Sequence, residues 1–140
     1  MTKKKAALSQ VVPVLTAVLL CDAAVAEPNS GKPNLIGVFD RLYVGSFPTA
    51  RHLSVYIKLT DAEGAYSLEV RQVQVSSCST LSKAAMEMHI DDRLSSTDFC
   101  LGMPLLQFPQ EGLYEFQVWA NSIFLGSATL KAIQNQPKLK

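Results

Sequence analysis

Apolar and polar side chains alternate most regularly near the C-terminal end of the chain. Over residues 112–120 the apolar positions Tyr114, Phe116, Val118 and Ala120 alternate with Glu115, Gln117 and Trp119. This period of two is typical of a strand with one buried face. Asn121-Ser122 follows as a two-residue turn in which Asn tolerates a positive φ, and residues 123–125 begin a return strand. The segment predicts a β-hairpin and indicates an all-β protein.

The same alternation predicts two paired strands in the middle of the chain. Residues 53–60 carry apolar side chains at the odd positions, and residues 66–71 carry them at the even positions. Asp61-Ala62-Glu63-Gly64 lies between them as a turn, with a glycine available for a positive φ. Beyond Arg71 the apolar positions shift to Val73 and Val75, which predicts a β-bulge near Arg71-Gln72.

Polar segments separate the remaining elements. Residues 76–82 are a predicted loop, and residues 91–98 are a predicted loop or one short helical turn. Met86, Met88 and Ile90 mark a strand between them. Turn signals recur at intervals of about 8–12 residues, which is typical of sandwiches and small barrels. We therefore predict one antiparallel β-sandwich domain, immunoglobulin-like, with about seven or eight strands.

One tyrosine supports the immunoglobulin-like fold. Gly112-x-Tyr114-x-Phe116 matches the tyrosine corner, in which a Tyr two positions before a core residue bonds back to the preceding turn. We therefore expect the Tyr114 hydroxyl to bond the backbone between Pro109 and Glu111.

The N-terminal region has two interpretations. In the first, Pro13 starts a buried strand that runs from Val14 to Ala24 or Val25 and ends at the turn-rich residues 27–34. Its apolar run would lie in the core: Val14, Leu15, Val18, Leu19, Leu20 and Cys21.

In the second interpretation, residues 1–26 are a cleaved secretory signal. Lys3-Lys4-Lys5 would be its basic segment, residues 11–20 its apolar segment, and Ala24-Val25-Ala26 its cleavage site. Under the first interpretation, residues 14–133 form the sandwich. Residues 1–13 are then a flexible N-terminal segment, and residues 134–140, which lack apolar periodicity, are a flexible tail.

Several motifs bear on this choice. Leu20-Cys21-Asp22 is followed by Gly31-Lys32 and by Leu35-Ile36-Gly37-Val38-Phe39-Asp40-Arg41, and Phe108-Pro109 precedes Gly112-Leu113-Tyr114-Glu115-Phe116. Over about residues 18–130 the chain resembles a family of small uncharacterised bacterial β-sandwich domains. The resemblance implies that the N-terminal run is the first hairpin of the fold, and it implies no activity. Apolar residues 23–26 depart from the family pattern, in which acidic residues are commoner, so the signal-peptide interpretation stays open.

The composition favours a folded domain over a disordered chain or a nucleic-acid binder. The chain has 140 residues, of which 48% are hydrophobic and 18% charged, and its formal net charge is +1. The visible basic clusters, Lys3-Lys4-Lys5 and Lys138-Leu139-Lys140, lie at the two ends. We therefore expect no nucleic-acid partner, since such a partner requires extensive phosphate neutralisation, and no membrane span.

Few residues suggest chemistry. The chain has three cysteines, Cys21, Cys78 and Cys100, with no CxxC pair and only two histidines, which argues against a structural zinc site. The odd count suits a reducing compartment, whereas in an oxidising one Cys78 and Cys100 could pair.

The remaining polar candidates do not form a recognisable catalytic or metal-binding motif. His52 and His89 lie outside any nucleophile motif. The acidic cluster of Asp91-Asp92 and Asp98 is interrupted by Arg93 and lacks the glycine bend of a calcium loop. We expect no catalytic residue, no metal and no cofactor.

Aromatic residues provide the candidate site. Trp119 and Tyr56 fall on the polar phase of their strands, and Phe124 lies just beyond the hairpin turn. Outward rings either cover neighbouring strands or anchor a partner, and we predict a contact surface formed by Trp119, Tyr56 and Phe124.

These observations predict a non-enzymatic binding or assembly module of the cytoplasm that contacts a protein partner or a second copy of itself. The alternative is a secreted or periplasmic sandwich, with carbohydrate as a candidate ligand, after removal of residues 1–26.

Overall fold

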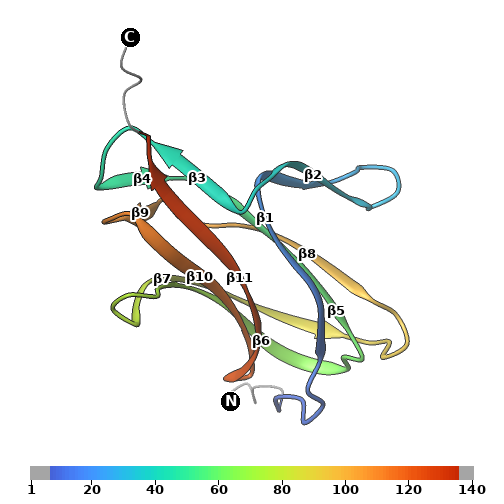
Figure 1. Ribbon diagram of the computed structural model, residues 1–140. Helices are drawn as coiled ribbons and strands as arrows, with labels where there is room; N and C mark the ends of the chain where they lie inside the picture. Colours follow the sequence, from blue (N-terminus) through green and yellow to red (C-terminus); the bar gives the residue numbers. More distant parts are fainter. Residues whose placement is uncertain (1–6, 136–140) are drawn as a thin grey trace, which may run out of the picture.

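The computed structural model describes residues 7–135, and all of their regular structure is strand (Figure 1). Four short strands of three to six residues, which the sequence pattern did not identify, raise the number above the expected seven or eight. The eleven strands are β1 (Val14–Ala26), β2 (Pro33–Val38), β3 (Arg41–Val44), β4 (Thr49–Arg51), β5 (Ser54–Thr60), β6 (Gly64–Gln74), β7 (Ser79–Ile90), β8 (Thr97–Gly102), β9 (Leu106–Phe108), β10 (Gly112–Ala120) and β11 (Ile123–Gln134).

The strands form two large sheets and one small one. The four-stranded sheet has the order β2-β1-β5-β8, the five-stranded sheet has the order β3-β11-β10-β6-β7, and β4 pairs with β9. All pairings between these strands are antiparallel except that of β3 with β11, which departs from the purely antiparallel arrangement expected. The reason is that the chain leaves β2, crosses to the other sheet and enters β3 in the direction of the last strand.

The core draws on both large sheets. The inward residues of β5, β6 and β10 have almost no exposed surface, as the alternation predicted, and they belong to one apolar cluster. Each large apolar side chain buried there contributes about 1.5–3 kcal/mol. The inward residues are Val55, Ile57 and Leu59 on β5; Tyr66, Leu68 and Val70 on β6; and Tyr114, Phe116 and Val118 on β10.

The apolar N-terminal run is strand β1, as the first interpretation expected. It lies between β2 and β5 and supplies Leu20 and Cys21 to the buried residues. The expectation that Val14 and Leu19 are also core residues is wrong, because both are exposed, Leu19 by 40%. Successive side chains of a strand point to opposite faces, so Leu19 and Leu20 cannot both point inward.

Residues next to the two ends of the described chain are paired. The backbone N–H of Ser9 donates to the carbonyl of Ala65 at 2.9 Å, and the Tyr66 hydroxyl donates to the carbonyl of Val11 at 2.8 Å. Gln134 ends β11 opposite Val44. The remaining parts of the two predicted flexible ends, residues 1–6 and 136–140, lie outside the described residues.

Strand β7 is longer than predicted. It begins at Ser79, within the segment expected to be a loop, and its pairing with β6 shifts between Gln72 and Val73 because Leu81 is the extra residue on β7. The predicted bulge therefore lies on the partner strand. The inward phase of β6 continues unbroken through the buried Gln72 and Gln74, whereas Val73 and Val75 lie on the outer face.

Tyr114 makes the hydrogen bonds expected of it. Its hydroxyl donates to the carbonyl of Gln110 at 2.5 Å and accepts from the backbone N–H of Gln110 at 3.3 Å. Its ring meets Phe108 edge-on, with the centroids 5.0 Å apart. Tyr114 thus fastens the start of β10 to the turn before it.

We expect Tyr114→Phe to lower the free energy of unfolding by about 1–2 kcal/mol, because both backbone groups of Gln110 lose their partner. Urea denaturation measures this loss. Tyr43→Phe, at an exposed ring, is the control and should change stability by less than about 0.5 kcal/mol. Equal stability of Tyr114→Phe and the wild type would show that the hydroxyl bond contributes nothing.

Candidate interaction surface

Trp119 and Phe124 lie together on the outer face of the five-stranded sheet. The register between β10 and β11 shifts after Val118, so that Trp119 stands opposite Phe124 across the hairpin. The ring centroids are 5.4 Å apart with an interplanar angle of 57°. Trp119 is half-buried and Phe124 is 49% exposed. The hairpin therefore presents two aromatic rings in contact.

Arg71 of β6 covers the indole ring. Its guanidinium carbon lies 4.1 Å from the centroid of the Trp119 ring, within the range of a cation–π interaction. Its Nε also donates to Oε1 of Glu69 at 2.6 Å, and this hydrogen bond lowers the pKa of the Glu69 carboxyl. Arg71 was not among the predicted site residues, although Arg71 and Glu69 both fall on the outward phase of their strand.

A row of side-chain hydrogen bonds along β10 fixes the indole. Trp119 Nε1 donates to Oε1 of Gln117 at 3.1 Å, and Gln117 Nε2 donates to Oε2 of Glu115 at 3.1 Å. The indole N–H thus has a hydrogen-bond partner in Gln117, and Arg71 lies over the ring. We use the name Trp119 surface for Glu69, Arg71, Glu115, Gln117, Trp119 and Phe124.

Tyr56, the third aromatic residue predicted for this surface, lies on β5 in the other large sheet. It is only 8% exposed, and its hydroxyl donates to the carboxylate of Asp98. Burial, followed by this hydrogen bond, raises the pKa of Tyr56 to about 12. The structure therefore brings Trp119 and Phe124 together and places Tyr56 away from them, among Leu19 of β1 and Cys100 of β8.

A family model described as a family of unknown function, DUF6941, matches residues 16–133. The chain belongs to this family. The match begins within β1 and ends within β11, so it includes both large sheets. A comparison with curated proteins finds no match.

Two of the polar candidates of this DUF6941 domain, His89 and Asp92, contact residues close to them in sequence. His89 Nε2 lies 3.0 Å from Oδ1 of Asp91, and both side chains are exposed. Asp92 accepts hydrogen bonds from the hydroxyl of Ser95 and from the backbone N–H of Leu94. These bonds close the turn after β7, and in that order they lower the pKa of Asp92.

Over residues 7–135, no three His, Cys, Asp or Glu side chains gather as a candidate metal site. Cys21, Cys78 and Cys100 are free thiols, and only Cys21 is buried. No helix in the described part of the DUF6941 domain has the length and hydropathy needed to cross a membrane.

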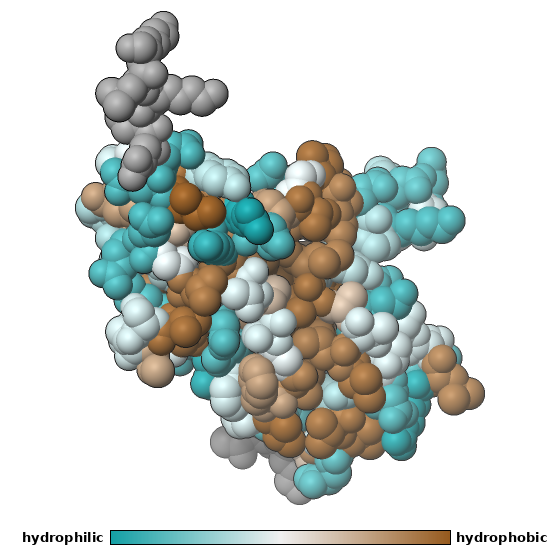
Figure 2. Space-filling view, viewed as in Figure 1, coloured by the Kyte–Doolittle hydropathy of each residue, from teal (hydrophilic) through white to brown (hydrophobic). Residues whose placement is uncertain are grey.

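The four-stranded sheet presents a second apolar region on its outer face. Cys21 stands opposite Val38 and Ala23 opposite Ile36, so these side chains share one face with Leu19 and Val25. Leu19, Val25, Ile36 and Val38 are all exposed. Figure 2 shows apolar residues gathered in a band that follows β1. The exposed apolar residues of this face are aliphatic, and its aromatic residue, Tyr56, is buried and hydrogen-bonded to Asp98.

Proposed function

We propose that the protein is an immunoglobulin-like sandwich that acts as a non-enzymatic protein-binding module, with the Trp119 surface as its contact site. The observation that carries the proposal is the indole of Trp119, held between Arg71 and Gln117 beside the exposed ring of Phe124. A ring that is already fixed loses little conformational entropy when a partner covers it. Trp and Arg are also enriched among the residues that dominate binding energy.

The sheet topology supports the immunoglobulin-like assignment. Strands β1, β5 and β8 occupy the positions of strands A, B and E, and strands β6, β10 and β11 occupy those of C, F and G. Tyr114 lies near the start of β10, where the tyrosine corner of such domains is found. On this fold, function resides in surface groups of the scaffold, not in the scaffold itself.

The charges around the two rings indicate a partner with mixed polarity. Glu69 stands opposite Trp119, Arg71 covers the indole, and Glu115 bonds to Gln117, the residue that accepts from the indole N–H. Protein interfaces commonly combine an apolar centre with such a polar rim. A protein surface that supplies an apolar side chain over Phe124 and hydrogen bonds to the rim matches this arrangement.

The place of β1 in the fold supports a protein that functions with residues 14–26 retained, in the cytoplasm. Cleavage after Ala26 would remove the strand that joins β2 to β5. The three free thiols suit a reducing compartment. The secreted, carbohydrate-binding alternative requires the remaining strands to fold without β1.

We expect Trp119→Ser to lower the melting temperature by no more than about 5 °C, because a half-exposed position contributes little to folding. The same change should abolish binding of the protein partner, measured by quantitative affinity capture from the source cells. Leu113→Ser is the matched control, since Leu113 is exposed on the same face of β10 at its far end. Undiminished capture by Trp119→Ser, or a much larger fall in its melting temperature, would contradict the proposal.

A further inference from the structure

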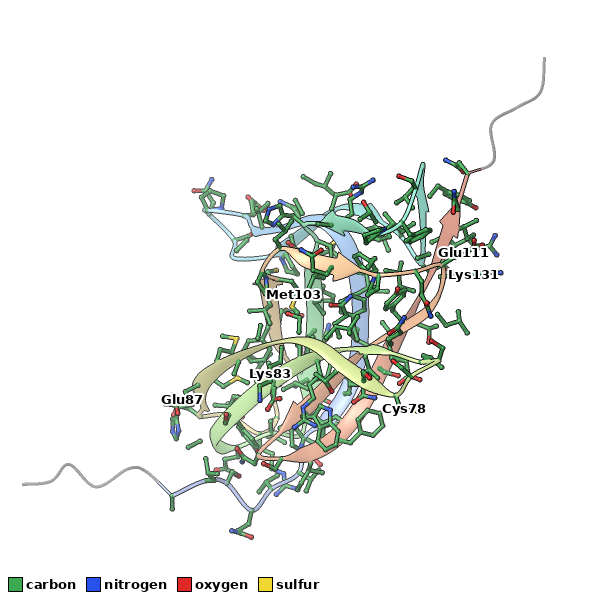
Figure 3. The ribbon with its side chains drawn as sticks, turned by 90° about the vertical axis from the view of Figure 1, so that its left-hand side faces the viewer. Cys78, Lys83, Glu87, Met103, Glu111 and Lys131 are labelled. Atoms are coloured by element: carbon green, nitrogen blue, oxygen red, sulfur yellow. The ribbon has the colours of Figure 1, made fainter. Side chains whose placement is uncertain are left out.

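One edge of the five-stranded sheet is open. Strand β7 hydrogen-bonds to β6 alone among the described strands, and β9 contacts it without joining its sheet, so the backbone groups on its other side have no strand partner within residues 7–135. It is 12 residues long, whereas natural proteins usually keep edge strands short or cover them. Figure 3 shows Lys83 and Glu87 spaced along this strand.

The side chains of β7 divide into two rows. Ala84, Met86 and Met88 are half-buried and pack against the core, whereas Lys83, Ala85 and Glu87 are exposed on the outer face. Lys83 stands opposite Arg71 of β6, which is a like charge already bonded to Glu69. Glu87 stands opposite Ser67. Within residues 7–135, neither Lys83 nor Glu87 has an ion-pair partner.

We propose that β7 pairs antiparallel with the same strand of a second copy of this chain, about a two-fold axis at Ala85. Such an interface is isologous, so a contact between residues i and j occurs twice. Lys83 then faces the partner's Glu87, and Glu87 faces the partner's Lys83, which gives both charges the partner that they lack in the single chain. The small Ala85 lies at the axis, where the two copies approach most closely.

The charge pattern selects this register. A two-fold axis perpendicular to the sheet keeps outer faces together, so outward residues meet only outward residues. An axis at Lys83 or at Glu87 would place two like charges opposite each other, which is destabilising. An axis at Ala84 or Met86 leaves both charges without an opposite partner. With the axis at Ala85, Ala84 and Met86 also meet on the inner face and cover each other's exposed side.

Charged residues on an edge strand can also serve to prevent pairing. That role requires only that charge be present, whereas the proposed dimer requires opposite charges at these two positions. The dimer uses β7 and not the Trp119 surface, so it stands independently of the proposed function. Reversal of the charges distinguishes the two roles of Lys83 and Glu87.

The experiment is sedimentation velocity on the full chain. One pair of strands buries less area than a standard interface, so the protein is measured from about 5 µM to about 500 µM. We expect a concentration-dependent dimer. Lys83→Glu and Glu87→Lys alone should each raise the dissociation constant about tenfold or more, because like charges then oppose one another twice. The double variant Lys83→Glu/Glu87→Lys restores opposite charges and should dimerise within about threefold of the wild type.

Mixing the two single variants gives the sharpest result. Lys83→Glu carries two acidic residues on the edge and Glu87→Lys carries two basic ones. An equimolar mixture should therefore form a heterodimer at concentrations at which each variant alone stays monomeric. Lys131→Glu and Glu111→Lys change the net charge equally at exposed positions away from β7 and should leave the dimer unchanged (Figure 3). Trp119→Ser should also leave it unchanged.

Hydrogen–deuterium exchange locates the contact. Amides within residues 80–90 should become protected as the protein concentration rises. A wild-type protein that stays monomeric throughout the range would overturn the proposal. A dimer that the single reversals do not weaken, or a mixture that fails to form the heterodimer, would overturn it equally.

Discussion

A chain that begins at Glu27 is expected not to fold cooperatively. It lacks β1, which pairs with β2 on one side and β5 on the other, so β2 has no neighbour left in its sheet. It also lacks Leu20, a core residue that is 2% exposed. Domains are stable by only about 5–15 kcal/mol, and the loss of a central strand exceeds this margin.

Thermal unfolding followed by circular dichroism measures the effect, with the full chain as reference. The truncated chain should show no sigmoidal transition. A cooperative transition close to that of the full chain would show that β1 is dispensable. That result would favour the interpretation of residues 1–26 as a cleaved signal.

Leu20→Asp is expected to cost about 4 kcal/mol or more, because it buries a carboxylate without a partner between the two large sheets. Its neighbour provides the control: Leu19 is exposed by 40% on the outer face, and Leu19→Asp should cost less than about 1 kcal/mol. Urea denaturation of the two variants measures the difference. Equal losses would mean that β1 does not present Leu20 and Leu19 to opposite faces.

Alternation predicted the strands whose two faces differ in polarity. Residues 53–60, 66–71 and 112–120 all form strands, and their apolar positions are buried, because each strand has one face on the core and one toward solvent. β1 lacks this contrast. Leu19 and Leu20 are equally apolar, so the sequence identifies a strand there without showing which residue points inward.

The buried glutamines of β6 could not be predicted from local pattern. Gln72 Nε2 donates to the carbonyl of Gln107 at 3.0 Å, and Gln74 accepts from the hydroxyl of Ser77 at 2.9 Å. A buried amide is tolerated when such partners exist, and the amide of Gln72 is satisfied on its nitrogen only, because its Oε1 has no partner among the described residues. The partner of Gln72 comes from β9, a strand distant in sequence, and the local sequence does not show it. The apolar Val73 and Val75 therefore suggested a change in the inward positions of β6 that does not occur.

The candidate site could be predicted only in part, because some of its residues are brought together by strands that are distant in sequence. Trp119 and Phe124 belong to one hairpin, and a two-residue turn is enough to place them near each other. Arg71 reaches Trp119 only through the pairing of β6 with β10, which joins distant segments. Tyr56 occupies an outward position, as its phase indicated, but the neighbouring strands of its sheet leave it little exposed surface.

The parallel pairing of β3 with β11 has a mechanical consequence. Strand β11 is flanked by β10 along most of its length. Strand β3 flanks it over Lys131–Gln134, at its C-terminal end (Figure 1). A load applied to the chain beyond Gln134, along the axis of β11, acts along both rows of hydrogen bonds at once. These bonds then bear the force together in shear, whereas a peeling force would break them one after another. Strand β11 is therefore expected to resist a pull along its own axis more strongly than a pull that peels it from the sheet.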